Sequence, residues 1–265
     1  MSSSPSDGKG TPTLEAVYTA DEMMTIAASR VLHDGMTCFV GIGLPSTAAN
    51  VARRTHAPGV VLVYESGTIG AKPRRLPLSI GDGELAETAD AVVSVPEIFN
   101  YWLQGGRIDV GFLSAAQIDR YANLNSTVIG SYETPTVRLP GAGGAPEIAA
   151  SCKEIIVVMR QRPRAFVAEL DFITSVGHGS GPDDRRRLGL TGKGPTLVIT
   201  DLGLLRPRPG TLELELTHLH RGVTADQVQA ATGWDLKIAA ELEETLPPNE
   251  TELSVLRELT TPGGA

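Results

Sequence analysis

The sequence is poor in cysteine and in aromatic residues, and it has no long apolar run. Its two cysteines, Cys38 and Cys152, lie in or beside apolar segments, outside any Cys-x-x-Cys or cysteine–histidine spacing. We therefore expect reduced, buried thiols instead of a disulfide or a metal site. No apolar stretch approaches the ~20 residues that cross a bilayer, and the N-terminal segment lacks the order of a signal peptide. These features predict a cytoplasmic protein without a membrane partner and without a bound metal.

Positive charge is also scarce, because 23 lysine and arginine residues face 31 acidic residues and the net charge is -8. This balance gives no electrostatic reason to expect nucleic acid as a partner. With 265 residues, 41% of them hydrophobic, the chain is long enough for one large α/β domain. We predict a single domain over residues 19–265, preceded by a flexible tail over residues 1–18.

The spacing of apolar residues predicts alternating helices and strands. A capping box of Thr19 and Glu22 begins a helix, which leads into a short apolar strand over residues 36–40. A glycine loop, a helix over 46–54 and a strand over 60–64 follow. This alternation indicates an α/β fold with an open, mostly parallel sheet and flanking helices. Further strands are expected over residues 108–113, 136–139, 154–159, 196–200 and 211–220, the last as an arm of an antiparallel hairpin, and short helices over 96–103, from 224 and from 249.

The acidic residue Glu65 stands directly after an apolar strand, in the stretch V-L-V-Y-E-S-G-T-I-G. Ligands of open α/β sheets gather at the carboxyl ends of the strands, so Glu65 is a candidate reactive group. A helix cap or an ion pair is the structural alternative. The loop G-I-G-L-P also follows a strand, and its residues Gly41 and Gly43 allow a ligand to approach the backbone closely. A tight strand-to-helix turn explains this loop equally well.

Two later segments contain further candidates. L-P-G-A-G-G-A-P-E-I carries Gly143 and Gly144, which indicate either a left-handed turn or backbone N–H groups aimed at an oxyanion. A-A-Q-I-D-R-Y-A-N-L-N-S-T is rich in polar side chains, with Gln117 and Asn125 among them. This pattern is typical of a turn whose amides satisfy one another, and direct contact with a substrate is the alternative.

A histidine and a basic strip complete the set of candidates. His178 lies among glycines, and the chain has no G-x-S-x-G segment that could supply a nucleophile for a catalytic histidine. A structural or merely exposed histidine is therefore favoured. The strip Arg185–Arg187 is more typical of a solvated or subunit-facing patch than of a binding site, although it could meet phosphates.

Several motifs occur in a fixed order between about Thr19 and Leu259: F-V-G-I-G-L-P, V-Y-E-S-G, L-P-L-S-I-G-D, S-A-A-Q-I-D-R-Y-A-N-L-N-S-T-V-I-G and R-L-P-G-A-G-G-A. This series resembles the B (beta) subunit of family I CoA-transferases, and within the family it is most similar to the beta subunit of glutaconate CoA-transferase. The resemblance implies the α/β fold of that family and an active site shared with an A (alpha) subunit, in a heterodimer or a higher A/B oligomer. It also implies an acyl-CoA thioester and a carboxylic acid as substrates, with no tightly bound cofactor.

By the same resemblance, Glu65 is the covalent nucleophile, which exchanges acyl and CoA groups through an anhydride and a glutamyl-CoA thioester. Gly143 and Gly144 match the glycine loop of the family and are the expected oxyanion donors. The residues expected to contact CoA or the acyl group are Gly41, Ile42, Gly43, Leu44, Gln117, Asn125 and His178.

Two positions depart from the family pattern. The chain has S-A-A-Q at Ser114–Gln117 where G-G-A-Q or G-A-x-Q is common, and His178 replaces an aromatic residue, which could alter acyl selectivity. Proteins of this fold also include hydrolases and decarboxylases of CoA thioesters. Those reactions are therefore alternatives to the expected transfer between short dicarboxylic or branched acids. A non-catalytic scaffold or sensor subunit is a third interpretation.

Overall fold

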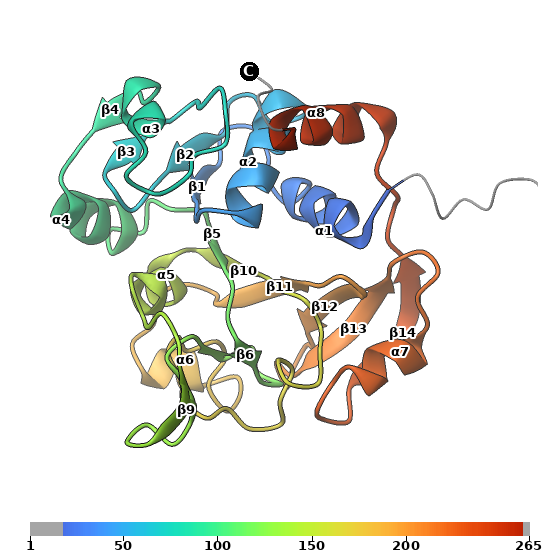
Figure 1. Cartoon of the computed structure of the whole chain (residues 1–265). Coiled ribbons are helices and arrows are strands. Elements are labelled where there is room, and N and C mark those ends of the chain that lie inside the picture. Colours follow the sequence, from blue (N-terminus) through green and yellow to red (C-terminus); the bar gives the residue numbers. More distant parts are fainter. Residues whose placement is uncertain (1–17, 262–265) are drawn as a thin grey trace, which may run out of the picture.

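The computed structural model describes residues 18–261, and one large sheet runs through them (Figure 1). The tail predicted over residues 1–18 lies outside the described residues except for Tyr18. The strands of this sheet are β1 (Thr37–Phe39), β2 (Val61–Val63), β3 (Thr68–Ile69), β4 (Ala91–Val92), β5 (Val110–Leu113), β10 (Glu154–Val158), β11 (Pro195–Ile199), β12 (Gly203–Pro207), β13 (Leu214–Leu219) and β14 (Lys237–Glu244). Their order is β14-β13-β12-β11-β10-β5-β1-β2-β3-β4. A single domain over residues 19–265 stays a prediction.

The centre of the sheet is parallel, and antiparallel pairs flank it. β1 pairs in parallel with β2 and β5, and β10 pairs in parallel with β5 and β11. β12 is antiparallel to β11 and β13, while β3 is antiparallel to β2 and β4. These pairings confirm the predicted α/β fold and the predicted hairpin arm, which is β13. Because the central strands share one direction, their carboxyl ends meet at one edge of the sheet.

Helices cover both faces of the sheet. They are α1 (Ala20–Ser29), α2 (Leu44–Arg54), α3 (Gly83–Glu87), α4 (Val95–Glu97), α5 (Ala145–Ser151), α6 (Asp184–Arg187), α7 (Ala225–Ala230), α8 (Glu250–Thr260) and the π-helical turn η2 (Ile98–Leu103). α1, α2 and α8 pack together on one side, and α5 with η2 lies on the other (Figure 1). The predicted capping box begins α1, since the Thr19 side chain accepts from the Glu22 N–H and the Glu22 carboxylate accepts from the Thr19 N–H.

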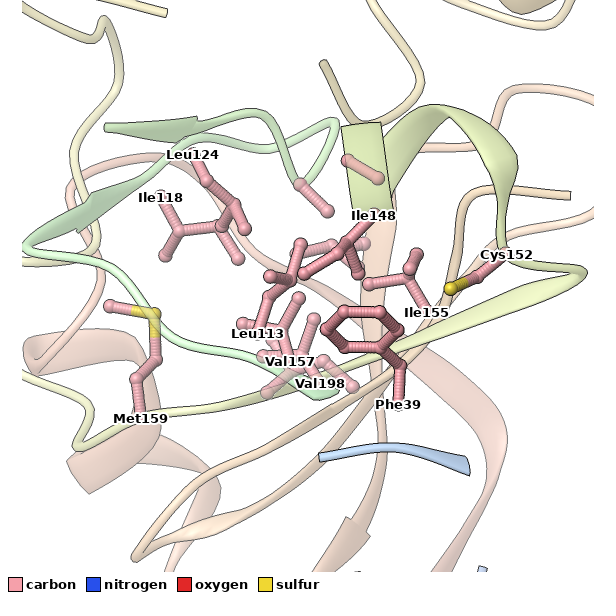
Figure 2. Packing of buried hydrophobic residues seen from close by; sticks show 14 of the residues in the cluster. Phe39, Leu113, Ile118, Leu124, Ile148, Cys152, Ile155, Val157, Met159 and Val198 are labelled. Atoms are coloured by element: carbon pink, nitrogen blue, oxygen red, sulfur yellow. The ribbon is translucent and has the colours of Figure 1, made fainter. Parts of the chain in front are cut away.

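The two faces of the sheet bury separate hydrophobic clusters. Ile155 and Val157 of β10 belong to the cluster beneath α5, which Figure 2 shows, whereas Ile156 and Val158 belong to the cluster beneath α1 and α2. Successive strand residues point to opposite faces, so one apolar strand supplies both clusters. This double burial explains why the central strands read as continuous apolar runs in the sequence.

Some elements differ from the sequence predictions. The strand predicted over residues 136–139 is β9 (Pro135–Arg138), which pairs with β8 (Val128–Gly130) outside the main sheet. β6 (Gln117–Ile118) and β7 (Leu124–Asn125) form another small sheet. Cys38 and Cys152 are free and buried, as predicted. Within residues 18–261, no helix is long and apolar enough to cross a membrane, and no group of three or more His, Cys, Asp or Glu side chains could hold a metal ion.

Candidate active site

Glu65 lies at the tip of a hairpin at the carboxyl end of β2. β2 and β3 pair antiparallel, and a turn over Tyr64–Gly67 joins them, closed by the Gly67 N–H donating to the Tyr64 carbonyl at 3.0 Å. The structural alternatives for Glu65 do not hold in this structure. A strand instead of a helix follows the turn, and the half-exposed carboxylate makes no ion pair or hydrogen bond with any other described residue.

Gly67 fixes the shape of this turn. Its φ is 111°, a conformation that other residues adopt only with strain, and a Cβ at this position would lie 2.1 Å from the Val93 carbonyl oxygen. The Val93 N–H in turn donates to the Gly67 carbonyl at 2.9 Å. The hairpin tip is thereby held against the segment between β4 and α4.

Tyr64 anchors the turn from the other side. Its side chain is fully buried, and its hydroxyl lies 3.1 Å from Ser46 Oγ in the first turn of α2. Asn50 donates to the Ser46 carbonyl at 2.9 Å, and burial raises the pKa of the Tyr64 phenol. The residue next to Glu65 is therefore tied to the helix that follows the G-I-G-L-P loop.

The glycine loop before α5 faces the Glu65 carboxylate. A Cβ built on Gly144 would lie 3.2 Å from Glu65 Oε1, so the two segments are in contact distance although they are far apart in the sequence. Gly143 has a φ of 50°, in the left-handed region that glycine favours. Among the hydrogen bonds of residues 18–261, neither the Gly143 N–H nor the Gly144 N–H has an acceptor. Two unpaired backbone donors thus stand near a carboxylate that is also unpaired.

An open hollow of about 320 Å³ contains this contact. Its lining consists of Glu65, Phe99, Gln104, Gly143, Gly144, Pro146 and Glu147. The sequence predicted three of these residues, and it gave no signal for Phe99 or Gln104 because their segment resembled an ordinary short helix. The predicted residues Gly41–Leu44, Gln117, Asn125 and His178 lie outside this lining.

Two larger hollows, of about 480 and 590 Å³, lie at the opposite edge of the sheet. Both are lined by Met36, Val110 and Glu154, which lie at the amino ends of β1, β5 and β10. Size alone would favour them as binding sites. The chemistry favours the smaller hollow, because the carboxylate and the unpaired backbone donors lie there.

The G-I-G-L-P loop leads from β1 into α2 at the same edge of the sheet as Glu65. Around Gly41 and Gly43, a built Cβ would meet no atom within 4 Å, so both residues border open space. Gly43 is also the residue at which α2 begins. The loop thus forms the strand-to-helix turn that was one of its two interpretations, and its contact with CoA stays a prediction.

Gln117 and Asn125 are buried and hydrogen-bonded to each other. Asn125 Nδ2 donates to Gln117 Oε1 and to the Val128 carbonyl, both at 2.7 Å, and Gln117 Nε2 donates to Asp171 Oδ2 at 2.7 Å. Both amides therefore hold β6, β7 and the neighbouring loop together. This is the arrangement expected of a turn-rich segment whose amides satisfy one another.

Arg185 corrects the sequence interpretation of the basic strip. It is buried, whereas Arg186 and Arg187 are exposed. Its guanidinium donates to the carbonyls of Gly192 at 2.9 Å, Gly177 at 2.8 Å and Ala149 at 3.0 Å. Ala149 belongs to α5, so this buried cation ties the helix behind the glycine loop to two other segments. A run of three arginines gave no sign of this burial.

His178 packs in the same region as a neutral side chain. It is buried, with Nε2 donating to the Pro195 carbonyl at 2.8 Å, and Nδ1 is buried without a partner among the described residues. Burial lowers its pKa below the ordinary value of 6.5, and Arg185 lowers it further, whereas the bond to Pro195 opposes the shift. His178 thus has the structural role that the sequence favoured, and its contact with the acyl group stays a prediction.

Buried histidines predict acid sensitivity of the fold. Burial lowers the pKa of both His178 and His220 from 6.5, so below pH 6.5 the unfolded chain binds protons that the folded chain does not. We expect the free energy of unfolding to be highest above pH 6.5 and to fall on acidification, by at most about 1.4 kcal/mol per pH unit for each histidine. Urea unfolding between pH 7.5 and 5.5 measures this slope. His220→Gln should reduce it, and an unchanged slope would contradict the assignment.

An α/β protein with an unpaired carboxylate at a strand end, beside two unpaired backbone N–H donors, has the groups that acyl transfer through a covalent carboxyl intermediate requires. Comparison with known proteins identifies the family: the chain belongs to the Coenzyme A transferase family, whose pattern matches residues 21–231. It is accordingly a CoA-transferase.

Individual relatives agree with the family assignment. The chain is 62% identical to the B subunit of 3-oxoadipate CoA-transferase from Pseudomonas knackmussii, over 92% of this chain and 94% of that protein. It is 35% identical to the B subunit of glutaconate CoA-transferase from Acidaminococcus fermentans, over 94% of each. The crystal structure of glutaconate coenzyme A-transferase from Acidaminococcus fermentans superposes with a TM-score of 0.87, at 33% identity, over 94% of this chain and 97% of the other. The fold and the family named from the sequence are both confirmed.

Proposed function

We propose that this chain is the catalytic beta subunit of a two-subunit CoA-transferase that moves CoA between short dicarboxylic acids through a glutamyl-CoA thioester on Glu65. The observation that carries the proposal is the unpaired Glu65 carboxylate, which faces Gly144 in an open hollow. The 62% identical relative is named for 3-oxoadipate, so an oxo-dicarboxylic acid is the first acyl group to test, ahead of glutaconate.

The proposed reaction passes through four exchanges at the Glu65 carboxyl group. A Glu65 oxygen attacks the thioester carbonyl, the C–S bond breaks, and CoA leaves as a thiolate while an acyl-glutamyl anhydride remains. The thiolate attacks the Glu65 carbonyl and releases the first acid as its carboxylate, which leaves a glutamyl-CoA thioester. The acceptor carboxylate then attacks this thioester, and the released thiolate attacks the new anhydride. The products are the second acyl-CoA and the original Glu65 carboxylate.

The glycine loop is suited to the charge that develops in each step. Every attack places negative charge on a carbonyl oxygen, and backbone donors that are already in position stabilise such an oxygen. We therefore assign this role to the N–H groups of Gly143 and Gly144. Both N–H groups are unpaired, and Gly144 lies against the carboxylate that reacts.

A partner completes the proposed site. The hollow is open, whereas the anhydride and the thioester both hydrolyse unless water is excluded. Both relatives are named as the second of two kinds of subunit, and we infer an alpha subunit that closes this hollow. The proposal includes a cytoplasmic location, which agrees with two free and buried cysteines.

Trapping the covalent intermediate tests the proposal. The complex with the alpha subunit is incubated with acyl-CoA without an acceptor, and the tryptic peptide over residues 55–74, which contains Glu65, is then analysed by mass spectrometry. We expect a CoA adduct on this peptide, which hydroxylamine converts to a hydroxamate and borohydride reduces. A peptide that stays unmodified would favour the alternative of a non-catalytic scaffold or sensor.

Product analysis separates transfer from the remaining alternatives. Transfer consumes the acyl-CoA only when an acceptor carboxylate is present, and it conserves the thioester. Hydrolysis releases free CoA, and decarboxylation releases carbon dioxide, without any acceptor. Acceptor-dependent formation of a second acyl-CoA is the expected result, and acceptor-independent turnover would overturn the assignment.

A further inference from the structure

A π-helical turn brings two additional side chains to the hollow that contains Glu65. At the end of η2, the Gln104 N–H donates to the Phe99 carbonyl, five residues earlier, at 2.9 Å. In a regular α-helix, side chains five residues apart point about 140° away from each other around the axis. The wider π turn brings them to nearly the same face, and both Phe99 and Gln104 line the hollow. Such turns occur mostly as single insertions and often at functional sites.

The Phe99 ring stands beside the reacting carboxylate. A single point, the position of a Cβ built on Gly144, lies 2.8 Å from Phe99 Cζ and 3.2 Å from Glu65 Oε1. Phe99 is half-buried and packs against Phe39 of β1, with the ring centroids 6.2 Å apart and the planes tilted by 59°. The core thus fixes the orientation of the ring. An acyl carbonyl within reach of Glu65 would bring the substituents on its neighbouring carbon against this ring.

Gln104 supplies a polar group on the same face. Its side chain is exposed, and its amide makes no hydrogen bond with any residue between 18 and 261. A free amide can donate two hydrogen bonds to a keto or carboxylate oxygen and can accept from a donor. The aromatic ring and the amide therefore present one apolar and one polar contact to a molecule bound at Glu65.

We propose that Phe99 and Gln104 form the specificity wall that this chain contributes to the acyl site. Phe99 excludes acyl groups that are branched at the carbon next to the thioester carbonyl, and Gln104 binds an oxygen function farther along the chain. The inference rests on the proposed function, since it assigns the acyl selectivity of the same site. It narrows the predicted substrates from short dicarboxylic or branched acids to unbranched acids that carry a keto or carboxylate group.

Three acyl-CoA probes with five acyl carbons test the role of Phe99: pentanoyl-CoA, its branched isomer 2-methylbutyryl-CoA, and glutaryl-CoA. The readout is kcat/KM for thioester consumption by the assembled complex of alpha and beta subunits. Phe99→Ala should raise the ratio of branched to linear substrate about tenfold, because a pocket distinguishes one methyl group by roughly this factor. Phe99→Leu, which keeps more of the core contact with Phe39, should shift the ratio in the same direction by less.

The control and the contradicting outcome come from the same turn. Tyr101 is exposed on η2 and lies under the Arg107 guanidinium, outside the lining of the hollow, so Tyr101→Leu should leave the ratio unchanged. A ratio that stays at the wild-type value in both Phe99 variants, in complexes of normal size and unfolding temperature, would overturn the role of Phe99.

Gln104 is tested by the other pair of probes. Gln104→Ala should lower kcat/KM for glutaryl-CoA relative to pentanoyl-CoA by about fivefold, the effect of one lost hydrogen bond. Gln104→Glu should lower it further, because two carboxylates repel each other. Equal ratios in all three proteins would overturn this role. Failure of the proposed function is visible separately, because wild-type enzyme would then form no adduct on Glu65 while the consumption ratios still report the wall.

Discussion

Replacing Glu65 with glutamine is expected to abolish CoA exchange, with a loss of at least about 10⁴-fold in rate, because an amide cannot displace CoA from a thioester. Glutamine has nearly the same shape as glutamate, and the Glu65 carboxylate makes no ion pair or hydrogen bond with the rest of the described chain. The fold and the assembly with the alpha subunit should therefore survive. Chromatography of the acyl-CoA products measures the loss, together with the size and the unfolding temperature of the complex.

Two further variants make the result of this experiment decisive. Glu65→Ala should show the same loss, and it lacks an amide that could hydrolyse back to the acid. Glu97→Gln removes an exposed carboxylate from α4, outside the lining of the hollow, and should retain normal exchange. Exchange above about 1% of the wild-type rate in Glu65→Ala would contradict the assignment of the nucleophile. Glu147 would then be the next carboxylate to replace, because it lines the same hollow.

The position of Glu65 could be predicted because it depends on local patterns alone. An apolar strand followed by an acidic residue and Gly67 places the carboxylate at the end of a buried strand, and the structure has this arrangement. The same reasoning predicted a strand, a glycine loop and a helix around Gly143 and Gly144. Their contact with Glu65 was not predictable from spacing, because the parallel order of β2, β1, β5 and β10 brings the two loops to one edge.

Phe99 and Gln104 show where sequence patterns stop being informative. The segment P-E-I-F-N-Y-W-L has the composition of a short helix, and its period does not distinguish an α turn from a π turn. The difference is one hydrogen bond, from Gln104 to Phe99, which depends on how η2 packs. Arg185 is a similar case, since the carbonyls that accept from it lie in separate segments of the chain. A solvated arginine and a buried one look alike in the sequence.

The hairpin that carries Glu65 is fixed on three sides, which matters for a nucleophile whose carboxyl group takes part in four exchanges in one catalytic cycle. Tyr64 is buried and bonded to Ser46, Gly67 fits only beneath the Val93 carbonyl, and Gly144 stands opposite the carboxylate. Groups held in this way need little reorganisation before each exchange. The acyl group and CoA must therefore move in and out of the hollow while the carboxylate stays in place.

Substituting Gly144 with alanine is expected to slow formation of the Glu65 adduct by at least about 10²-fold, because a reacting group displaced by 1 Å loses about this much. The new methyl group would lie 2.8 Å from Phe99 Cζ and 3.2 Å from Glu65 Oε1, in the space that the reacting carbonyl must enter. Alanine keeps the backbone N–H, and the φ of -83° at Gly144 suits any residue. The loss would therefore report occupied space, and single-turnover kinetics of CoA release measures it.

Gly143→Ala distinguishes occupied space from a strained loop. At Gly143 a built Cβ meets no atom within 4 Å, but the φ of 50° costs alanine about 1 kcal/mol. We expect a lower unfolding temperature and a smaller kinetic loss than in Gly144→Ala, whose unfolding temperature should change less. Equal kinetic losses in the two variants would mean that the backbone conformation of the loop limits the reaction, instead of the space beside Glu65. In that case Phe99→Ala should not restore adduct formation to Gly144→Ala, whereas relief of crowding by the smaller side chain should restore part of it.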